Sequence, residues 1–339
     1  MKTTIKDIAK RVGVNPSTVS RVINGTASIS DEVKAKIYEA MRELDYHPNS
    51  QARSLVSGST RTIGLVIHTG NKDSFSNAYF IQSISAIENI AQSNGFNLLI
   101  INFANLNNRE AIKGLVLENR ADGVILPISS ITDDVVKLLQ DHEFPFVVMG
   151  EPEENSEGDC FWVDMDNQQG GCLAVDHLME HGFKHPILIV EDTEKMFERK
   201  RILGFKNGLK KWNIPWNESY IIECGTEGLH IKEKMADILN QTIAAGSIIC
   251  TNNIVAYNVL QELKKGGIKV PEDMGVVTFD NYPLAEYMDP PLTVVDVDTY
   301  KMGEQAAVVL FEKIKHVAKK EKNMLIPTQI ISRSSTQRS

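Results

Sequence analysis

From residue 61 onward, short apolar runs rich in Ile, Val and Leu alternate with longer segments of helical period. The runs span residues 62–67, 97–101, 123–126, 145–149, 187–190, 220–223, 247–250 and 275–279. Between the first two, Ile81, Ile84, Ile87 and Ile90 recur at the spacing of one helix face. Because short buried strands that alternate with helices build parallel sheets, the pattern predicts two doubly wound α/β subdomains with a ligand site at the strand ends.

The first 60 residues follow a different pattern, typical of three short helices. Each helix has its own apolar stripe: Ile5, Ile8, Ala9 and Val12 in the first, Val19, Val22 and Ile23 in the second, and Val33, Ile37, Met41 and Leu44 in the third. Gly13 suits a helix end, and Asn15 with Pro16 suits a helix start. The arrangement predicts a helix-turn-helix whose second helix reads DNA, with a plain three-helix cap as the alternative.

Charge is distributed unevenly between these two regions. Residues 1–60 carry nine Lys and Arg against six acidic residues, a balance of +3, whereas the remainder carries 27 against 38, a balance of −11. A basic head on an acidic body favours contact with a polyanion at one end of the molecule.

Two stretches of sequence identify a family resemblance. TIKDIAKRVGVNPSTVSRVING, residues 4–25, closely resembles the headpiece of the lactose-repressor/galactose-repressor (LacI/GalR) family of bacterial transcription regulators. YHPNSQARSLVSGSTRTIGLVI, residues 46–67, resembles that family's hinge helix and first core strand. The resemblance implies an N-terminal all-α helix-turn-helix headpiece plus an α/β periplasmic-binding-protein-like core of two doubly wound parallel-sheet subdomains. The expected boundaries are 1–45 for the headpiece, 46–60 for the hinge, 61–161 plus 293–322 for the first subdomain, and 162–292 plus 323–339 for the second.

The resemblance also implies which residues contact DNA. They are Thr4, Asn15, Pro16, Ser17, Thr18, Ser20, Arg21 and Asn24 in the headpiece, and Asn49, Ala52, Arg53 and Leu55 in the hinge. Pro16 and Ser17 fall where the family varies its side chains to choose a sequence, and Arg21 is suited to a bidentate contact with guanine. Leu55 matches the leucine that the family wedges into the minor groove, where an apolar side chain unstacks a base step.

For the effector site, the resemblance implies Asp166, Arg201, Asn252 and Asp280. His68, Phe75 and Tyr79 belong to a stretch that departs from the family pattern, and they are expected at the site because they lie near the end of the first strand, where an aromatic side chain can stack on a sugar ring. Arg201 would donate to effector hydroxyls and Asp280 would accept from them, chemistry that suits a small carbohydrate. Asn253 and Asn281 stand where the family commonly has aspartate. Similarity to the maltose-operon branch suggests maltose or another α-glucoside as the effector.

These observations predict a repressor of sugar-utilisation genes that binds a pseudo-palindromic operator and is controlled allosterically by its effector. The segment after Asn323 has no leucine heptad, which by comparison with the family favours a homodimer over a tetramer. A regulator activated by a corepressor or a phosphoprotein is the alternative within the family. A sugar-binding transport component is a more distant one, because it would lack the basic helical head.

An enzyme is not expected, and neither is a cofactor. HLMEH, residues 177–181, matches a zinc-peptidase pattern, but a helix that ends at Gly182 explains the same residues. Cys160, Cys172, Cys224 and Cys250 form no CxxC pair and are interpreted as buried structural thiols. The chain has no apolar run long enough for a membrane span and its first residues do not resemble a signal peptide, so a cytoplasmic location without a membrane partner is expected.

Overall fold

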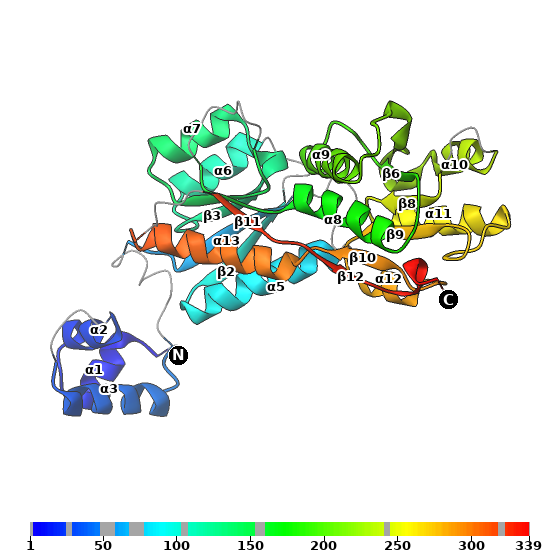
Figure 1. Cartoon of the computed structure of the whole chain (residues 1–339). Coiled ribbons are helices and arrows are strands. Elements are labelled where there is room, and N and C mark those ends of the chain that lie inside the picture. Colours follow the sequence, from blue (N-terminus) through cyan, green and yellow to red (C-terminus); the bar gives the residue numbers. More distant parts are fainter. Residues whose placement is uncertain are drawn as a thin grey trace.

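The computed structural model describes residues 3–24, 29–47, 58–67, 78–102, 108–152, 160–240, 245–317 and 323–338. They form a helical headpiece and two α/β units, called lobe 1 and lobe 2 below (Figure 1). Within these ranges, no helix is both long enough and apolar enough to cross a membrane.

The headpiece consists of α1 (Ile5–Val12), α2 (Pro16–Asn24) and α3 (Asp31–Glu43). The predicted stripes meet in one small core, in which Ile8, Val19 and Ile37 are the most buried side chains. Gly13 ends α1 with φ 75°, a left-handed conformation that glycine adopts without steric cost. Arg11 joins α1 to α3, because its Nε and Nη2 both donate to Glu43 Oε2, at 3.2 and 2.9 Å.

Lobe 1 is a six-stranded sheet with the order β11-β5-β4-β3-β1-β2, and all its described pairings are parallel. The strands are β1 (Thr62–Ile67), β2 (Asn97–Asn102), β3 (Val124–Pro127), β4 (Phe146–Met149), β5 (Trp162–Met165) and β11 (Asn323–Ile326). On one face the core includes α5 (Ala78–Ser93) and α13 (Thr299–Ile314), and on the other α6 (Asn108–Leu117) and α7 (Asp133–Asp141).

Lobe 2 repeats this plan with the order β12-β10-β9-β8-β6-β7. Its strands are β6 (Pro186–Val190), β7 (Ile221–Glu223), β8 (Ser247–Cys250), β9 (Gly275–Phe279), β10 (Thr293–Asp296) and β12 (Gln329–Ile331), the last of which is antiparallel to β10. One face packs on α8 (Asn167–Glu180) and α9 (Met196–Lys211). The other packs on α10 (Ile231–Leu239), α11 (Asn253–Lys265) and α12 (Pro283–Tyr287).

Three chain crossings connect the lobes, and they correct the expected subdomain boundaries. The chain passes from β5 to α8, from β10 to α13 and from β11 to β12. The predicted boundaries assign residues 162–165 and 323–326 to the second subdomain and residues 293–296 to the first. The backbone ladders instead pair Val163 with both Met149 and Met324, and Val294 with Thr278. The error arises because an apolar strand beside a crossing fits either sheet equally well by composition.

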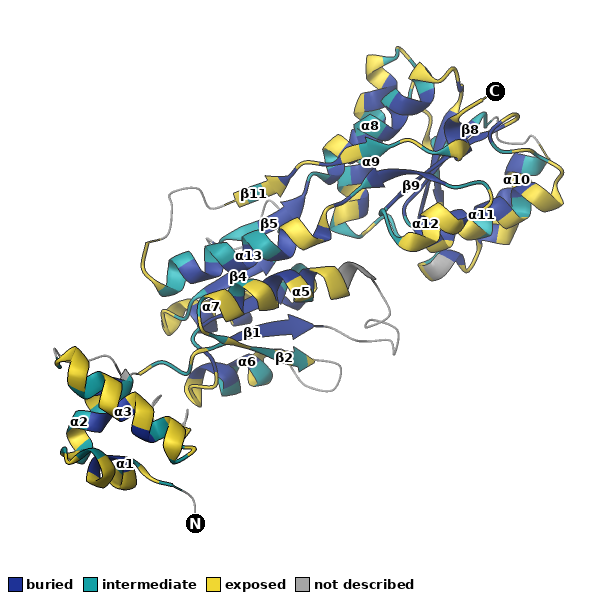
Figure 2. Cartoon of the chain, turned by 90° about the horizontal axis from the view of Figure 1, so that it is seen from below, coloured by how far each residue is buried: buried dark blue, intermediate teal, exposed yellow. Residues whose placement is uncertain are grey.

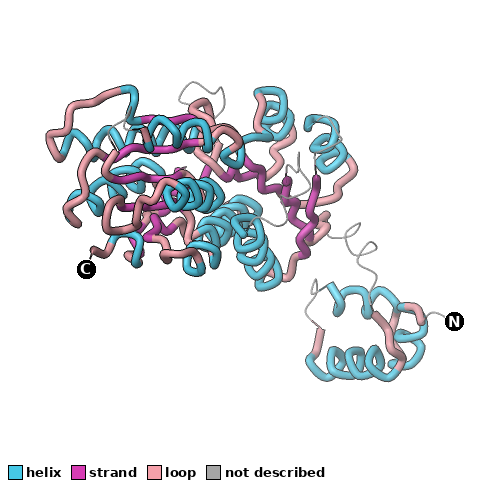
Figure 3. The backbone as a smooth tube through the Cα atoms, turned by 90° about the vertical axis from the view of Figure 1, so that its right-hand side faces the viewer, coloured by secondary structure: helices cyan, strands magenta, loops and turns pink. Residues whose placement is uncertain are grey.

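Burial follows the periodicity that the sequence predicts. The strands are largely buried, whereas the helices show buried inner faces and exposed outer faces (Figure 2). The parallel strands of each lobe form a layer between helices when seen from the side (Figure 3). A single hydrophobic core spans both lobes, and its buried residues include Ile63 and Leu310 in lobe 1 and Val175 and Phe279 in lobe 2.

Candidate DNA-binding surface and effector site

Helix α2 buries one face and presents a polar one, as a DNA-reading helix requires. Val19 and Val22 are buried, whereas Ser17 and Arg21 are exposed on the same helix. Pro16, Thr18 and Ser20 are half-buried. The exposed side chains are short apart from Arg21, so the helix can approach a major groove closely.

Side-chain bonds fix the starts of the first two helices. The Asn15 carboxamide oxygen accepts from the Ser17 backbone N–H at 3.1 Å and from its hydroxyl at 2.9 Å. The Asp7 carboxylate accepts from the backbone and hydroxyl of Thr4 at 2.8 and 2.7 Å. Asn15 therefore has a structural role at the start of α2, and any contact it makes with DNA comes in addition.

Several predicted site residues lie outside the described ranges. These are Asn49, Ala52, Arg53 and Leu55 of the hinge, and His68 and Phe75 of the expected effector site. Asn24 and Tyr79 are described as parts of α2 and α5, but their side chains are not.

Arg201 lies at the centre of a polar group at the carboxyl ends of the lobe 2 strands. We call this group the strand-end cluster, and it consists of Asp164, Asn167, Glu191, Glu198, Arg201, Thr251, Asn252 and Asp280. Arg201 is only 6% exposed. Its Nε donates to Asn167 Oδ1 at 2.9 Å, and its Nη1 donates to the backbone oxygen and hydroxyl of Thr251 at 2.7 and 3.1 Å. Among the described residues, no acceptor lies within hydrogen-bond distance of Nη2.

Aromatic rings hold the same guanidinium in place. Its carbon lies 3.9 Å from the centre of the Phe279 ring and 5.0 Å from that of Phe197. Such stacking orients a planar donor without using its N–H groups. The position of Arg201 is therefore set before a ligand arrives.

Three carboxyl groups surround Arg201 with raised pKa values. Burial raises the pKa of Glu198, of Asp164 and of Asp280, the last to about 6, while the charge of Arg201 opposes each rise. Glu198 is fully buried, and its carboxylate accepts from the Thr251 hydroxyl at 2.6 Å. Asp164 belongs to β5 of lobe 1, so the electrostatic coupling reaches across both lobes.

Asp280 follows β9 in an unusual backbone conformation. Its φ is 75°, in the left-handed region that non-glycine residues rarely adopt. Two hydrogen bonds to its backbone groups hold this conformation. The Asp280 N–H donates to Val295 O at 3.1 Å, and the Asp280 carbonyl accepts from the side-chain amide of Asn253 at 3.0 Å. Such strain is common at binding sites. Asn253, at a position where aspartate is usual in the family, therefore supports the backbone of Asp280.

The structure describes the side chains of four predicted effector residues, Asp166, Arg201, Asn252 and Asp280, and the first three make hydrogen bonds within the protein. Asn252 accepts from the Val255 backbone N–H at 2.9 Å and donates to Glu191 Oε1 at 3.0 Å. Asp166 accepts from the Gln169 backbone N–H at 2.7 Å and begins α8.

Sequence reasoning missed Glu198, Thr251 and Phe279 as parts of this site. Glu198 lies one helical turn before Arg201, a spacing that places two side chains on one helix face. Acidic and basic residues at that spacing are common on exposed helix faces. The sequence alone therefore gives no sign that this carboxylate is buried. Asn281, the other departure from the family pattern, accepts from Arg333 Nη2 at 2.7 Å and so anchors the C-terminal segment.

The histidines of HLMEH have a structural role. His177 is buried, and its Nε2 lies 2.8 Å from the hydroxyl of Thr336. His181 Nδ1 lies 2.8 Å from the His177 carbonyl oxygen, and α8 ends there as predicted. Of the four cysteines, Cys160, Cys224 and Cys250 are buried as expected, whereas Cys172 is half-buried.

Comparison with known proteins identifies both parts of the chain. The model described as bacterial regulatory proteins, lacI family, matches residues 4–49, and the periplasmic binding protein-like domain model matches residues 175–336. An HTH-type transcriptional repressor PurR from Vibrio parahaemolyticus is 31% identical over 99% of each chain. The PurR of Vibrio vulnificus is 32% identical over 92% of each chain.

Solved structures share the complete fold. A lac repressor dimer bound to operator and the anti-inducer ONPF aligns with a TM-score of 0.82 at 22% identity, covering 100% of both chains. A complex of the transcriptional regulator CelR with cellobiose aligns with a TM-score of 0.73 at 25% identity, covering 98% of this chain and 100% of that one.

The sequence relatives are transcriptional repressors and not enzymes, and they match this chain across both the headpiece and the lobes. The chain belongs to the LacI family of bacterial regulatory proteins and is a DNA-binding transcriptional repressor with a ligand-binding domain.

Proposed function

We propose that this repressor responds to an uncharged carbohydrate that binds at the strand-end cluster. The observation that carries the proposal is that Arg201, whose Nη2 has no acceptor among the described residues, lies within electrostatic reach of the Asp280 carboxyl. A sugar hydroxyl is both donor and acceptor, so adjacent hydroxyls satisfy these two groups together. Phe197, 37% exposed beside Arg201, offers an apolar surface to a sugar ring.

The charge balance of the cluster argues against a phosphorylated effector. Asp164, Glu191, Glu198 and Asp280 supply four carboxyl groups, and Arg201 is the only cation among the eight residues of the cluster. Lys195 and Lys200 lie nearby but already pair with Glu191 and Glu151. A phosphate dianion would therefore meet uncompensated negative charge in a buried setting. Maltose, suggested by the family branch, is the first ligand to test.

The proposed coupling to DNA uses the contacts that join the lobes. Lys200 of α9 pairs with Glu151, which follows β4, at 2.8 Å. An effector that bridges lobe 1 and lobe 2 favours one arrangement of the lobes and so biases the hinge before lobe 1. Linkage requires different effector affinities for the DNA-bound and released forms, with typical coupling of about 1–3 kcal/mol.

Exposed apolar side chains on lobe 2 support a homodimer. Leu229 is 77% exposed, Tyr287 is 81% exposed, and Tyr257 and Leu284 are each nearly half exposed. Tyr257 belongs to α11, Leu284 and Tyr287 belong to α12, and Leu229 lies just before α10, so all four are on the side of the sheet that these helices cover. Two copies joined there would present two headpieces to the halves of a pseudo-palindromic operator. Tyr287→Glu is expected to yield monomers in size-exclusion chromatography with light scattering, whereas Leu203→Glu on α9 leaves the dimer intact.

The central experiment is a fluorescence-anisotropy titration against a pseudo-palindromic duplex with a central CpG at fixed salt. It is repeated with sugars, phosphosugars and a purine base. Release by an uncharged sugar, abolished by Asp280→Asn, is the expected result. Stronger DNA binding with a ligand would instead indicate corepression, and a response to a phosphosugar or purine alone would refute the proposed effector class.

The hinge has its own test in the same assay. Leu55→Ser is expected to weaken operator binding much more than nonspecific binding, because it removes the wedge and keeps the phosphate contacts. Equal losses on operator and random duplex would reject the wedge role of Leu55.

A further inference from the structure

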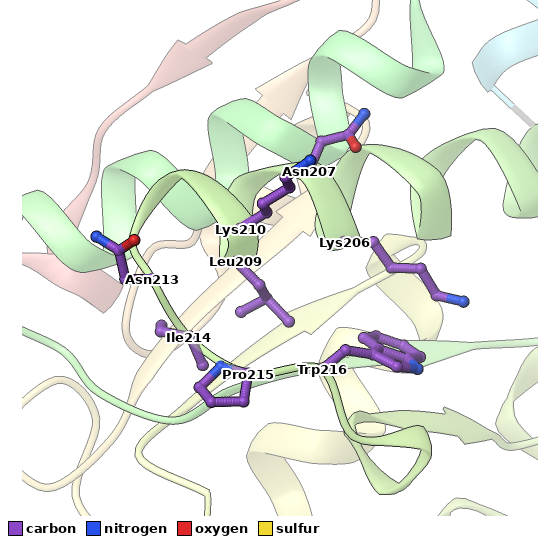
Figure 4. A pocket seen from close by; sticks show the side chains of 8 residues that line it. All are labelled: Lys206, Asn207, Leu209, Lys210, Asn213, Ile214, Pro215 and Trp216. Carbon is purple, nitrogen blue, oxygen red and sulfur yellow. The ribbon is translucent and has the colours of Figure 1, made fainter.

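A pocket on the flank of lobe 2 lies apart from the strand-end cluster. It has a volume of about 520 Å³ between the second half of α9 and the segment that follows it. Leu209, Ile214 and Pro215 form its apolar part, and Lys206, Lys210, Asn207, Asn213 and Trp216 complete the lining. Figure 4 shows Leu209 pointing from α9 toward the segment that carries Ile214 and Pro215, with Lys206 extending over Trp216.

The two lysines of this pocket differ from the other cations of α9. Arg199, Lys200 and Lys211 each pair with a carboxylate, and Arg201 is held in the strand-end cluster. Among the described residues, Lys206 and Lys210 have no acidic partner, and the pocket lining contains no acidic residue. On a chain with a net charge of −8, this is a local excess of positive charge that fits an anion.

Trp216 supplies a fixed aromatic surface beside these lysines. Its Nε1 donates to Glu218 at 2.8 Å, and its ring makes edge contacts with Phe205 and Tyr220. The Lys206 ammonium covers one ring face at 4.1 Å from the centre. A lysine side chain is flexible, so a flat or cyclic group can replace the ammonium on that face while Lys206 turns to an adjoining anion.

We propose that this pocket is a second ligand site for a small phosphorylated ring compound. The ring packs on Trp216, and Lys206 and Lys210 hold the phosphate as point charges. The side-chain amides of Asn207 and Asn213 have no recorded partner in the described ranges, and they supply donors and acceptors for the polar groups of the ring.

This site is separate from the strand-end cluster but shares a helix with it. Lys210 lies nine residues after Arg201, about 13 Å along α9 and on the opposite face. The close contact of α9 with α8 makes the pair a rigid element, because a Cβ on Gly204 would collide with the backbone of Gln168. A ligand on the flank therefore acts on the same element that carries Arg201.

Isothermal titration calorimetry on the full chain tests the proposal, with glucose 6-phosphate and AMP as separate probes. Each probe is compared with its unphosphorylated form and with inorganic phosphate. The double variant Lys206→Gln/Lys210→Gln is expected to weaken binding of the phosphorylated probes by at least about tenfold, because it removes both charges that hold the phosphate. Lys232→Gln/Lys234→Gln, an exposed pair on α10, is the control and leaves binding unchanged. Asp280→Asn also leaves it unchanged, which separates this site from the strand-end cluster.

Binding of glucose 6-phosphate alone or of AMP alone identifies the ring and supports the proposal. Three results would overturn it: equal affinity of the wild type and the double lysine variant, loss of binding in Asp280→Asn, or no heat with either probe at millimolar concentration. Equal affinity of the two proteins or absence of heat leaves the proposal for an uncharged sugar untouched, because sugar binding is measured independently. Loss of binding in Asp280→Asn would also count against that proposal, because it would place a phosphorylated ligand at the strand-end cluster.

Discussion

Asp280 combines a buried carboxyl, a raised pKa and a left-handed backbone at one position. Its pKa of about 6 lies above the ordinary value of 3.8, so the folded state holds this proton more tightly than the unfolded chain does. The contribution of Asp280 to the free energy of unfolding therefore decreases as pH rises from 4 to above 6. As an acceptor for an effector, in contrast, the carboxylate is needed, so effector binding improves over the same pH range.

The substitution Asp280→Asn separates these two effects. Effector affinity is expected to fall by about ten- to hundredfold, the usual loss for a hydrogen bond to a charged group. Thermal stability at pH 7.5 is expected to rise, with little change at pH 4. Calorimetric titration and thermal unfolding at both pH values check the pair of outcomes. An Asp280→Asn variant that is less stable than the wild type at pH 7.5 would contradict the prediction that the charged carboxylate destabilises the folded state.

His177 predicts the opposite pH dependence. Burial lowers its pKa from 6.5 to about 4, with a further contribution from His181, so the folded state requires the neutral ring. Its stabilising effect is complete above pH 6.5 and is lost as pH falls from 6.5 toward 4. His177→Gln is expected to cost roughly 1–3 kcal/mol at pH 7.5, because the bond to Thr336 is buried.

The measurement is the free energy of unfolding of wild type and His177→Gln from pH 7.5 to 4. The two curves are expected to converge at low pH, since the wild type alone must protonate this buried ring. Parallel curves would show that His177 does not contribute acid sensitivity.

At the scale of elements, three glycines set the distance between α8 and α9. A Cβ on Gly204 would meet Gln168 backbone, a Cβ on Gly171 would meet Arg201 backbone, and a Cβ on Gly208 would lie 2.7 Å from Val175. Backbone atoms cannot rotate away as a side chain can, so the helices would have to separate. This spacing also determines where Arg201 stands, because Arg201 belongs to α9.

Gly204→Ala is therefore expected to destabilise the fold by about 1–3 kcal/mol or more. Gly114→Ala on α6 is the matched control, since the nearest atom to its Cβ is the flexible Glu118 side chain at 3.9 Å. There the better helix propensity of alanine should add about 0.5–1 kcal/mol of stability. Chemical denaturation of both variants measures the difference, and equal effects would reject the packing argument.

The sequence predicted where helices and strands lie better than it predicted which strands pair in each sheet. The strands at 62–67, 247–250 and 275–279 have the bounds that their apolar runs indicate, and α1 to α3 follow their stripes. Sheet membership of β5, β10 and β11 was wrong, because pairing depends on chain crossings that local composition does not record. The same limit applies to the site: Arg201 and Asp280 were identified from motifs, whereas Glu198 became visible only when folding placed it against Thr251.

At the scale of the whole molecule, the pair of Lys200 and Glu151 links the two lobes. Both side chains are mostly buried, at 24% and 21% exposed, so their attraction favours the arrangement seen here. Lys200→Gln is expected to weaken effector binding by about two- to fivefold, equivalent to roughly 0.5–1 kcal/mol for one ion pair.

Arg199→Gln is the control for Lys200→Gln, because the adjacent Arg199 pairs with Glu194 within lobe 2. Effector titration of both variants distinguishes a contact between lobes from a general effect of charge. If Arg199→Gln weakened binding as much as Lys200→Gln, the bridging role would be wrong.

The last two strands, β11 and β12, close one edge of each sheet, whereas the headpiece lies within the first 50 residues. During translation, the headpiece leaves the ribosome early, whereas the sheets of both lobes are complete only after residues 323–331 have been synthesised. A message cut short before residue 323 would therefore yield a protein with a whole DNA-reading unit and two unfinished lobes, which cellular proteases recognise as unfolded. The order of the strands thus couples the survival of the DNA-reading unit to the completion of its sensor.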